Sequence, residues 1–473
     1  MTARVAGSDR GHIPLGVSAV DGESRSRWGL LSDRGFRLLW SGQTISSAGS
    51  SITAVALPLV AVVDLHAGPL AVGLLMAAIW LPWLVLGLPA GVWVGRIPRR
   101  TLMISCDVAM AVVFVSVPIA AWTHTLTEAY LLVVAVVSGT GSVFFMSAYQ
   151  VYLPELVGAG DLIEANAKLQ GSASVAQVVG PGAGGLAAQV FGVVSGLMAD
   201  AATFVISAVT LVLIKPRRHA EEDPRATPDG PHAGPDSVDA AQHSRSHSRP
   251  LRTEVADGFR FVVRDPYLRA ITAFGAAANL ALAAYQSIVV LYLVRDLHVR
   301  AGLVGPLAAA GALGGILGAW LVHPLCRRFG TARGAVAVQL VATPFAFLIP
   351  LASPGPGVAL FVIGSLALVA GTVAGNVVFA SFRQRYAPPE MVSRIITFAM
   401  TINHSSIPVG GLLGGGLGAV IGLRATLWAT AGVLVASCAI LLIGPLAHRR
   451  DLPTAARPAS HRSRGQHVTT WEA

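Results

Sequence analysis

Three ionisable side chains lie inside long apolar stretches of this sequence and are the first candidates for chemistry. Asp107 lies about six residues into one stretch, Asp200 about seven into another, and His404 near the middle of a third. Burying a charge in a membrane costs at least about 2.5 kcal/mol on insertion scales, so such a group is a functional candidate by default. Carboxylates and imidazole suit proton relay. We therefore expect proton coupling through these residues, a proton gradient as the energy source, no cofactor and no metal.

Each candidate also has a structural interpretation that the sequence leaves open. Asp200 fits a hydrogen bond that packs two helices together, and His404 fits a neutral imidazole hydrogen-bonded across helices. Asp107 fits a static ion pair with arginines at the inner face of the membrane. The alternative for Asp107 is a latch that closes a gate in one state only.

An arginine-rich turn follows one apolar stretch. Gly91–Arg100 reads Gly-Val-Trp-Val-Gly-Arg-Ile-Pro-Arg-Arg, and Gly318–Gly330 repeats its Gly-x-Trp start, its proline and its Arg-Arg end about half a chain later. We interpret the first copy as a tight cytoplasmic loop, and the echo predicts one six-helix unit used twice. The topology and gating residues of this turn are Gly91, Arg96, Arg99 and Arg100.

The composition is that of a membrane protein. Of the 473 residues, 53% are hydrophobic and 12% are charged, and the mean hydropathy is +0.64, which leaves too little charge to cover a soluble surface. The basic residues behind the net charge of +10 form short clusters between apolar runs, so we expect no nucleic-acid partner. Cys106, Cys326 and Cys438 are isolated in sequence and are expected to be reduced.

About 20 apolar residues cross a bilayer as a helix, and on that measure the chain has twelve spans. They are expected at 36–64, 70–94, 101–122, 128–150, 163–189, 193–214, 267–293, 301–325, 331–353, 357–382, 391–420 and 424–446. Of 34 lysines and arginines, only Arg295, Arg300 and Arg424 fall in alternate loops, which predicts cytoplasmic termini.

The predicted fold is an all-α membrane protein of two parallel six-helix repeats. Its parts are an N-terminal tail (1–33), an N-terminal half (34–214), a linker (215–265), a C-terminal half (266–446) and a C-terminal tail (447–473).

The linker has the composition of an unfolded segment up to about residue 250. Its end recovers an apolar stripe, formed by Leu251, Val255, Phe259 and Val262. We expect a helix lying on the inner leaflet there, with binding of a soluble partner as the alternative. The tail after His448 is again polar and is expected to be disordered.

The two halves correspond at further positions. Asp33 precedes the first span as Asp265 precedes the seventh. Pro181–Gly185 in the fifth span recurs as Pro408–Gly411 in the eleventh. The offset is 232 residues for the aspartates and 227 for the prolines, which predicts a parallel repeat.

The motifs resemble the major facilitator superfamily, and more narrowly its bacterial twelve-helix exporters of the enterobactin-exporter and macrolide-efflux type. The resemblance runs from about Arg34 to Leu446 and rests on short motifs in a fixed order. They are Phe36–Gln43, Gly91–Arg100, Pro154–Leu156, Ala165–Ala167, Gly180–Gly185, Asp200–Phe204, Asp265–Pro266 and Gln384–Arg394. The resemblance implies two halves that rock about a central cavity.

The fifth span carries what looks like the end of a motif of drug-proton antiporters. Its residues are Gly180, Pro181, Gly184 and Gly185. Small residues let this helix approach a neighbour closely, and the proline permits a bend.

The sequence departs from the family pattern in three places. Gly95 stands where an acidic residue usually precedes the first arginine of the loop, and Ser50 stands where one often follows a glycine in the first helix. No arginine shortly follows Asp107. The usual gating ion pairs and a first-helix proton site are therefore not assigned.

Polar groups midway along the spans are the candidate lining of the cavity. They are Gln43, Ser47, Gln170, Gln177, Asn279, Gln286, Asn376 and Asn403. Trp80 and Trp83 add two rings that either stack on a ligand or pack the helices. A mostly apolar pocket suits an amphipathic substrate, whose charge would be met by Asp107 or Asp200 if either faces the cavity.

The chain lacks the motifs of an enzyme or an ATP-driven pump. Its two lysines, Lys168 and Lys215, do not lie in a phosphate-binding loop, and neither Gly-x-Ser-x-Gly nor His-Glu-x-x-His occurs. We predict a monomeric secondary transporter in the lipid bilayer of the plasma (inner) membrane. Its predicted activity is proton-coupled export of a small amphipathic compound such as a drug, an antibiotic or a siderophore. An importer or uniporter of a metabolite and a non-transporting membrane sensor remain as alternatives.

Overall fold

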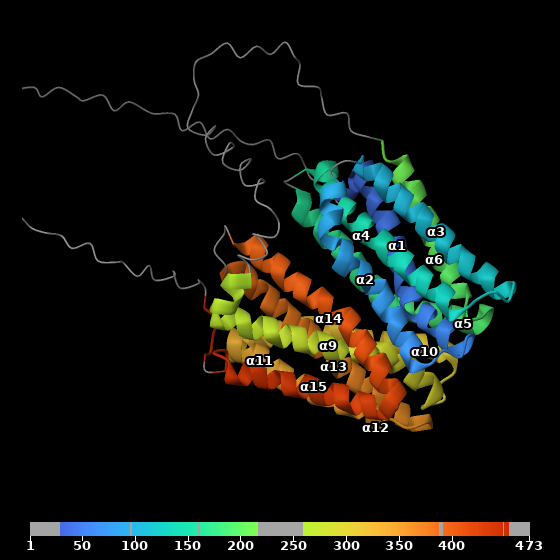
Figure 1. Cartoon of the computed structure of the whole chain (residues 1–473). Coiled ribbons are helices and arrows are strands. Elements are labelled where there is room, and N and C mark those ends of the chain that lie inside the picture. The colour runs from blue at the N-terminus through green and yellow to red at the C-terminus, as the bar shows by residue number, and fades with distance from the viewer. Residues whose placement is uncertain are drawn as a thin grey trace, which may run out of the picture.

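A computed structural model describes residues 29–94, 97–158, 161–215, 259–386, 391–447 and 449–453. Every regular element in these ranges is a helix (Figure 1). Most of the predicted linker, Arg96 and most of both predicted tails lie outside the described residues.

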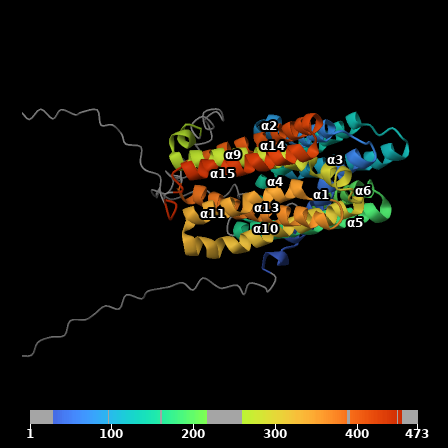
Figure 2. The ribbon, with the colours of Figure 1, turned by 90° about the horizontal axis from the view of Figure 1, so that it is seen from below.

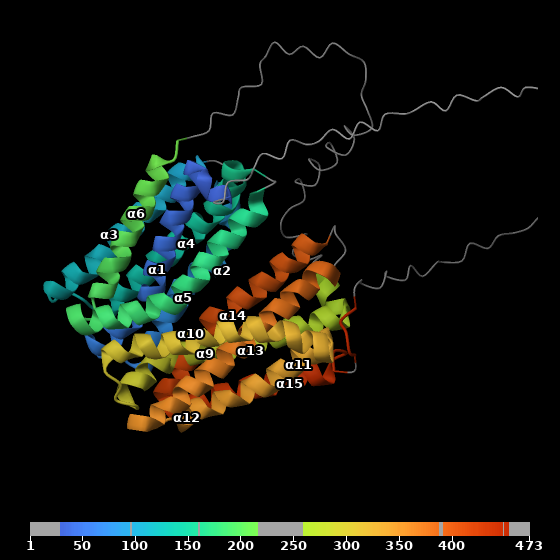
Figure 3. The same cartoon turned by 180° about the vertical axis from the view of Figure 1, so that it is seen from behind.

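The helices form two bundles that correspond to the two predicted halves (Figures 1 and 3). The first contains α1 (Arg34–Val63), α2 (Pro69–Val94), α3 (Arg99–Trp122), α4 (Glu128–Val157), α5 (Leu162–Phe191) and α6 (Ser195–Leu213). The second contains α9 (Pro266–Arg295), α10 (Ala301–Phe329), α11 (Thr331–Ala342), α12 (Leu348–Leu351), α13 (Val358–Tyr386), α14 (Val392–Ile421) and α15 (Leu423–Ile443).

Eleven of the described spans are long and apolar enough to cross a membrane, with α11 and α12 counted together as Thr331–Leu351. The remaining long helix is α5, which has 30 residues and is interrupted by polar side chains such as Glu164 and Lys168. The fold-class prediction of a two-bundle helical membrane protein is confirmed.

Two boundaries differ from the prediction for a local reason. The predicted span 331–353 is broken by a 3₁₀ helix at Thr343–Phe347, because Pro344 lacks the N–H that an α-helix needs. The fourth span continues seven residues further than predicted, so Pro154 and Glu155 lie inside α4 rather than in a loop.

Both halves begin with the same cap. The Asp33 carboxylate accepts a hydrogen bond from the Phe36 N–H (2.8 Å), and the Asp265 carboxylate accepts from the Tyr267 and Leu268 N–H groups (3.0 and 2.9 Å). An aspartate at this position satisfies backbone donors that the helix leaves unpaired. We call the face where α1 and α9 begin the terminal face and the opposite face the far face.

The most extensive contacts between the halves are made by two helix pairs, α2 with α14 and α5 with α10, which lie on opposite sides of the molecule (Figure 2). A Cβ atom on Gly415 would lie 2.8 Å from the Gly73 Cα atom, and one on Gly185 would lie 2.8 Å from the Gly305 Cα atom. Such distances leave no room for a side chain. Both contacts lie near the far-face ends of the helices.

Glycine contacts also fix the register of the repeat. Gly180 packs against α1 at Ala48 and Ser51, while Gly410 packs against α9 at Leu280 and Ala283. The fifth and eleventh spans therefore correspond through Gly180 and Gly410, 230 residues apart. The predicted match of Pro181 with Pro408 is wrong by three residues, because the prolines are not at equivalent packing positions.

The turns at the far face repeat as well. Asp64-Leu65-His66 follows α1, and Asp296-Leu297-His298 follows α9. The backbone of both histidines lies in the left-handed region, with φ of 52° and 53°. Burial raises the pKa of the Asp64 carboxyl, and nearby His66 partly offsets this rise. Burial also raises the pKa of the Asp296 carboxyl, and Arg424 partly offsets that rise.

One side chain bridges the halves at these turns. The Arg295 guanidinium donates to the carbonyls of His66 (2.9 Å) and Ala67 (2.8 Å). The repeat places Val63 at the equivalent position of the first half, so this bridge is present once in the described part of the chain.

The end of the linker packs on the protein. Residues 259–264 are helical, Val262 is buried in the C-terminal bundle, and the Phe259 ring lies 5.6 Å from that of Phe398. Val262 therefore packs against the protein, and the position of this helix on the membrane surface stays a prediction. Leu251 and Val255 lie outside the described residues.

The start of the C-terminal tail is also docked, contrary to the expectation of disorder after His448. The Arg450 carbonyl accepts from the N–H groups of Ala332 (3.1 Å) and Arg333 (3.3 Å). The Asp451 carboxylate accepts from the Thr331 N–H (2.9 Å). Because α11 begins after Gly330, which offers no side-chain acceptor, the tail supplies the missing cap.

Adding one methyl group at the contact between the halves tests its tightness. We expect Gly415→Ala to lower the thermal unfolding temperature of the purified protein by several degrees, because its Cβ would meet the Pro69 carbonyl oxygen at 2.7 Å and overpacking costs about 1–3 kcal/mol. Gly416→Ala is the matched control, since a Cβ there meets nothing within 4 Å. Equal unfolding temperatures for the two variants would contradict a close-packed seal.

Candidate functional site

The two predicted tryptophans and the predicted histidine form one aromatic cluster between the halves. The His404 ring on α14 lies 5.6 Å from the centroids of both Trp80 and Trp83 on α2, and it stacks on Trp83 with an interplanar angle of 21°. Trp80 and Trp83 are 6.3 Å apart. These residues lie near the middle of their helices, so contact between the halves extends from the far face to mid-depth.

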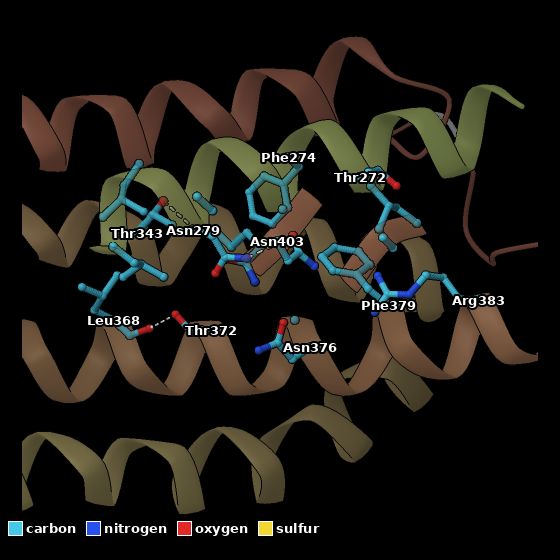
Figure 4. A pocket seen from close by; sticks show the side chains of 18 residues that line it. Thr272, Phe274, Asn279, Thr343, Leu368, Thr372, Asn376, Phe379, Arg383 and Asn403 are labelled. Atoms are coloured by element: carbon cyan, nitrogen blue, oxygen red, sulfur yellow. Dashed lines mark hydrogen bonds between the residues drawn. The ribbon is translucent and has the colours of Figure 1, made fainter. Parts of the chain in front are cut away.

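A polar pocket lies inside the C-terminal half, walled by α9, α11, α13, α14 and α15 (Figure 4). Three of the predicted cavity residues line it, namely Asn279, Asn376 and Asn403. The Asn279 amide donates to the Asn403 side-chain oxygen (3.1 Å), which ties α9 to α14. The volume that the centres of water molecules can occupy is about 60 Å³. The pocket thus admits a few waters or one small chemical group.

The pocket contains an arginine that the sequence did not single out. Arg383 was expected just beyond the end of the tenth span at residue 382, but α13 continues to Tyr386 and carries Arg383 into the pocket wall. Phe274 and Phe379 form an apolar wall beside it, with ring centroids 5.8 Å apart in an edge-to-face arrangement. A signal was available, because Arg383 follows Asn376 by seven residues and therefore lies on the same helix face.

Asp200 is enclosed within the N-terminal half. It is 1% exposed and accepts hydrogen bonds from the hydroxyls of Thr53 on α1 (2.5 Å) and Thr203 on α6 (3.0 Å). Gly49 provides the space for this group, because a Cβ there would collide with Asp200 and Thr203. The arrangement is that of a hydrogen bond joining two packed helices.

Asp107 is not paired with the arginines proposed for it. Arg99 forms an ion pair with Glu155 (3.1 Å), and Arg100 donates to the carbonyls of Leu211 (2.8 Å) and Val212 (2.6 Å) at the end of α6. The static pairing of Asp107 with these two arginines is therefore wrong, while Arg96 lies outside the described residues.

Asp107 has an incompletely satisfied carboxylate. It is 1% exposed, and its Oδ2 atom has no hydrogen-bond partner among the residues that the structure describes. Ser207 on α6 is its neighbour, but the hydroxyl does not form a well-aligned hydrogen bond with it. The carboxylate lies inside the N-terminal half rather than in the pocket of the C-terminal half.

The other predicted lining residues lie elsewhere. Gln43 and Ser47 share a face of α1 and do not line the described polar pocket. Gln170, Gln177 and Gln286 are exposed and do not line the described polar pocket.

The residues of the fifth-span motif contact two different helices. Gly180 and Gly184 pack against α1, while Gly185 and the Pro181 carbonyl meet α10. Gly91 lies within the last turns of α2.

The structural interpretation of Asp200 gives a direct prediction. We expect Asp200→Asn to remain folded and to keep any dependence of transport on the pH gradient, because an amide still bonds both threonines. Asp200→Ala removes the acceptor of the Thr53 hydroxyl, while the Thr203 hydroxyl keeps the backbone carbonyl of residue 200 (2.7 Å), and should destabilise the protein by about 1–3 kcal/mol. Unfolding temperatures and pH-gradient dependence check both variants, and a folded Asp200→Asn protein that has lost this dependence would make Asp200 a proton site.

The chain is similar to known proteins along most of its length. A curated relative, the multidrug efflux pump Tap of Mycolicibacterium fortuitum, is 25% identical over 429 residues, which are 87% of this chain and 96% of the relative. A bacterial homologue of the iron transporter ferroportin in its inward-facing state superimposes with a TM-score of 0.67 at 15% identity, covering 88% of this chain and 99% of the other. The outward-facing state of such a homologue gives a TM-score of 0.53 at 15% identity, with coverage of 88% and 100%.

The family model described as Major Facilitator Superfamily matches residues 39–411. That match spans most of the chain, from α1 into α14. Its members are transporters and not enzymes, so the prediction of a transporter fold built from two halves is confirmed. The chain belongs to the Major Facilitator Superfamily.

Proposed function

We propose that this transporter exports a small amphipathic compound from the cytoplasm in exchange for protons. The observation that carries the proposal is the similarity to the efflux pump Tap over 96% of that protein's length. The match to this relative covers both halves of the chain. Similarity over both halves is better support for a shared direction of transport than similarity over one half. The proposed location is the plasma membrane, with the chain acting as a monomer.

The terminal face is proposed to be cytoplasmic. Arginines gather there, including Arg99, Arg100, Arg327 and Arg328, whereas the far face has few, as the positive-inside rule requires. The contacts between the halves run from the far face to mid-depth, so this arrangement is closed to the outside. A substrate would therefore load from the cytoplasm, which is the first step of export.

The better superposition on the inward-facing structure than on the outward-facing one supports the same arrangement. Opening to the outside then requires the Gly73–Gly415 and Gly185–Gly305 contacts to separate and the Arg295 bridge to break. Alternating access supplies such a motion as a rotation of one half against the other.

His404 is the proposed link between protons and this motion. Its ring contacts Trp80 and Trp83 of the opposite half at mid-depth. A protonated imidazole against two indole faces gains a cation–π attraction that a neutral ring lacks, worth about 0.5–2 kcal/mol. Protonation would then favour the contact between the halves, and loss of the proton would favour their separation.

Replacing the imidazole with a ring that cannot be protonated tests this link. We expect His404→Phe to keep the fold and the stacking but to make the transport rate nearly independent of pH, because a phenyl ring cannot take up a proton. Trp80→Phe is the matched control, because it keeps an aromatic ring and leaves His404 unchanged. An unaltered pH profile in His404→Phe would remove His404 from the coupling mechanism.

Direction, coupling and substrate class can be measured together. In everted membrane vesicles with an internal acid load and a fluorescent pH reporter, we expect amphipathic compounds to accumulate and to release protons from the lumen. Accumulation only in right-side-out vesicles would support an importer. Transport of no compound in either orientation would favour a non-transporting sensor and overturn the proposal.

A further inference from the structure

We infer that the pocket of the C-terminal half binds an anionic group, so that the substrate is an amphipathic organic anion with an apolar body and a carboxylate or phenolate head. This inference rests on the proposed function for its biological role, since it names the class of the exported compound. It departs from the expectation that Asp107 or Asp200 meets a positive charge on the substrate.

The first observation is a partly buried cation without a counter-charge. Arg383 lines the pocket on α13, and no hydrogen bond or ion pair joins it to any residue that the structure describes. None of the 18 residues that line the pocket is an aspartate or a glutamate. A cation inside a membrane-spanning helix is costly, so a group with no protein partner is expected to be paired by a ligand.

The second observation is the pattern of donors around the cation (Figure 4). The Asn376 and Asn403 amides face the same pocket and offer N–H groups, whereas the Gln339 amide is already bonded to the Gly371 carbonyl (2.9 Å). Guanidinium and amide donors together match the oxygens of a carboxylate, and the planar guanidinium can bind both oxygens at once.

The third observation is where the acids lie. Asp200 is bonded to Thr53 and Thr203 inside the N-terminal half, and Asp107 is buried between α3 and α6 of the same half. Neither lines the polar pocket, so neither can offset the charge of Arg383 there.

The size and walls of the pocket define the rest of the ligand. About 60 Å³ admits a head group and not a whole drug-sized molecule. The rings of Phe274 and Phe379 provide apolar contact next to Arg383. Because Arg383 lies three residues from the terminal-face end of α13, an anion entering from that face meets the guanidinium first.

A matched pair of compounds tests the inference by binding alone. The probes are a short series of aryl carboxylates, including 4-biphenylcarboxylate, each paired with its neutral carboxamide. The measurement is the rise in unfolding temperature of the purified full-length protein with increasing ligand, from which an apparent Kd follows. We expect at least one acid to stabilise the wild type while its amide binds about tenfold to hundredfold more weakly.

Two variants assign that preference to the arginine. Arg383→Gln should remove the preference for the acid, and Arg383→Lys should retain part of it because the charge remains. Arg385→Gln is the matched control, since Arg385 is exposed on the opposite side of the same helix and lines a different cleft. It should bind the acid as the wild type does.

The outcomes separate this inference from the export proposal. Equal stabilisation by acid and amide, no stabilisation by any acid, or unchanged acid binding in a folded Arg383→Gln protein would overturn the inference. Acid binding that requires Arg383, without accumulation of that acid in everted vesicles, would instead overturn export while leaving the site in place.

Discussion

The structure depends on helix backbones that approach each other without intervening side chains. Gly73 lies against Gly415 on one side of the molecule, and Gly185 lies against Gly305 on the other. In a membrane, helices gain little from hydrophobic burial against each other, so close backbone contact and its dispersion energy must hold them. Because the two contacts are equivalent in the repeat, duplication of one unit creates both.

These two contacts also set how the molecule can move. They join the halves near the far face, and the cluster of Trp80, Trp83 and His404 extends the joint to mid-depth. A close-packed surface of this kind has discrete arrangements rather than a continuous range, which suits a switch between two states. In the proposed alternating access, rotation of one half against the other separates these contacts and changes access at both faces at once.

The halves share a fold but differ in chemistry. In the N-terminal half, Asp200 is hydrogen-bonded to Thr53 and Thr203, and Arg99 and Arg100 are bound to that half's own helices. In the C-terminal half, Asn279, Asn403 and Arg383 surround a pocket. The symmetric backbone therefore carries an asymmetric pocket, which we propose holds the head group of the ligand, and His404 lies between the halves.

Much of this organisation could be predicted from the sequence because it depends on local patterns. Span length follows from hydropathy, and the matching places of Asp33 and Asp265 before the first and seventh spans follow from the repeat. Asn279 and Asn403 were among the eight polar groups predicted to line a cavity. Arg383 was missed because a hydropathy boundary cannot tell the last turn of a helix from the loop after it. The docking of Asp451 on α11 and the contact of His404 with Trp83 join residues over 100 positions apart, which no local pattern encodes. The register of Gly180 with Gly410 required contacts for the same reason.

The central claim, that the halves rock about a joint closed at the far face, can be tested by distance measurements between spin labels. One pair of labels would replace His124 and Ser353 at the far face, and a second pair would replace Val151 and Arg327 toward the terminal face. Alternating access predicts opposite changes on titration from alkaline to acidic pH and on addition of a transported compound: when one distance lengthens, the other shortens. Distances that stay fixed, or that lengthen and shorten together, would contradict it.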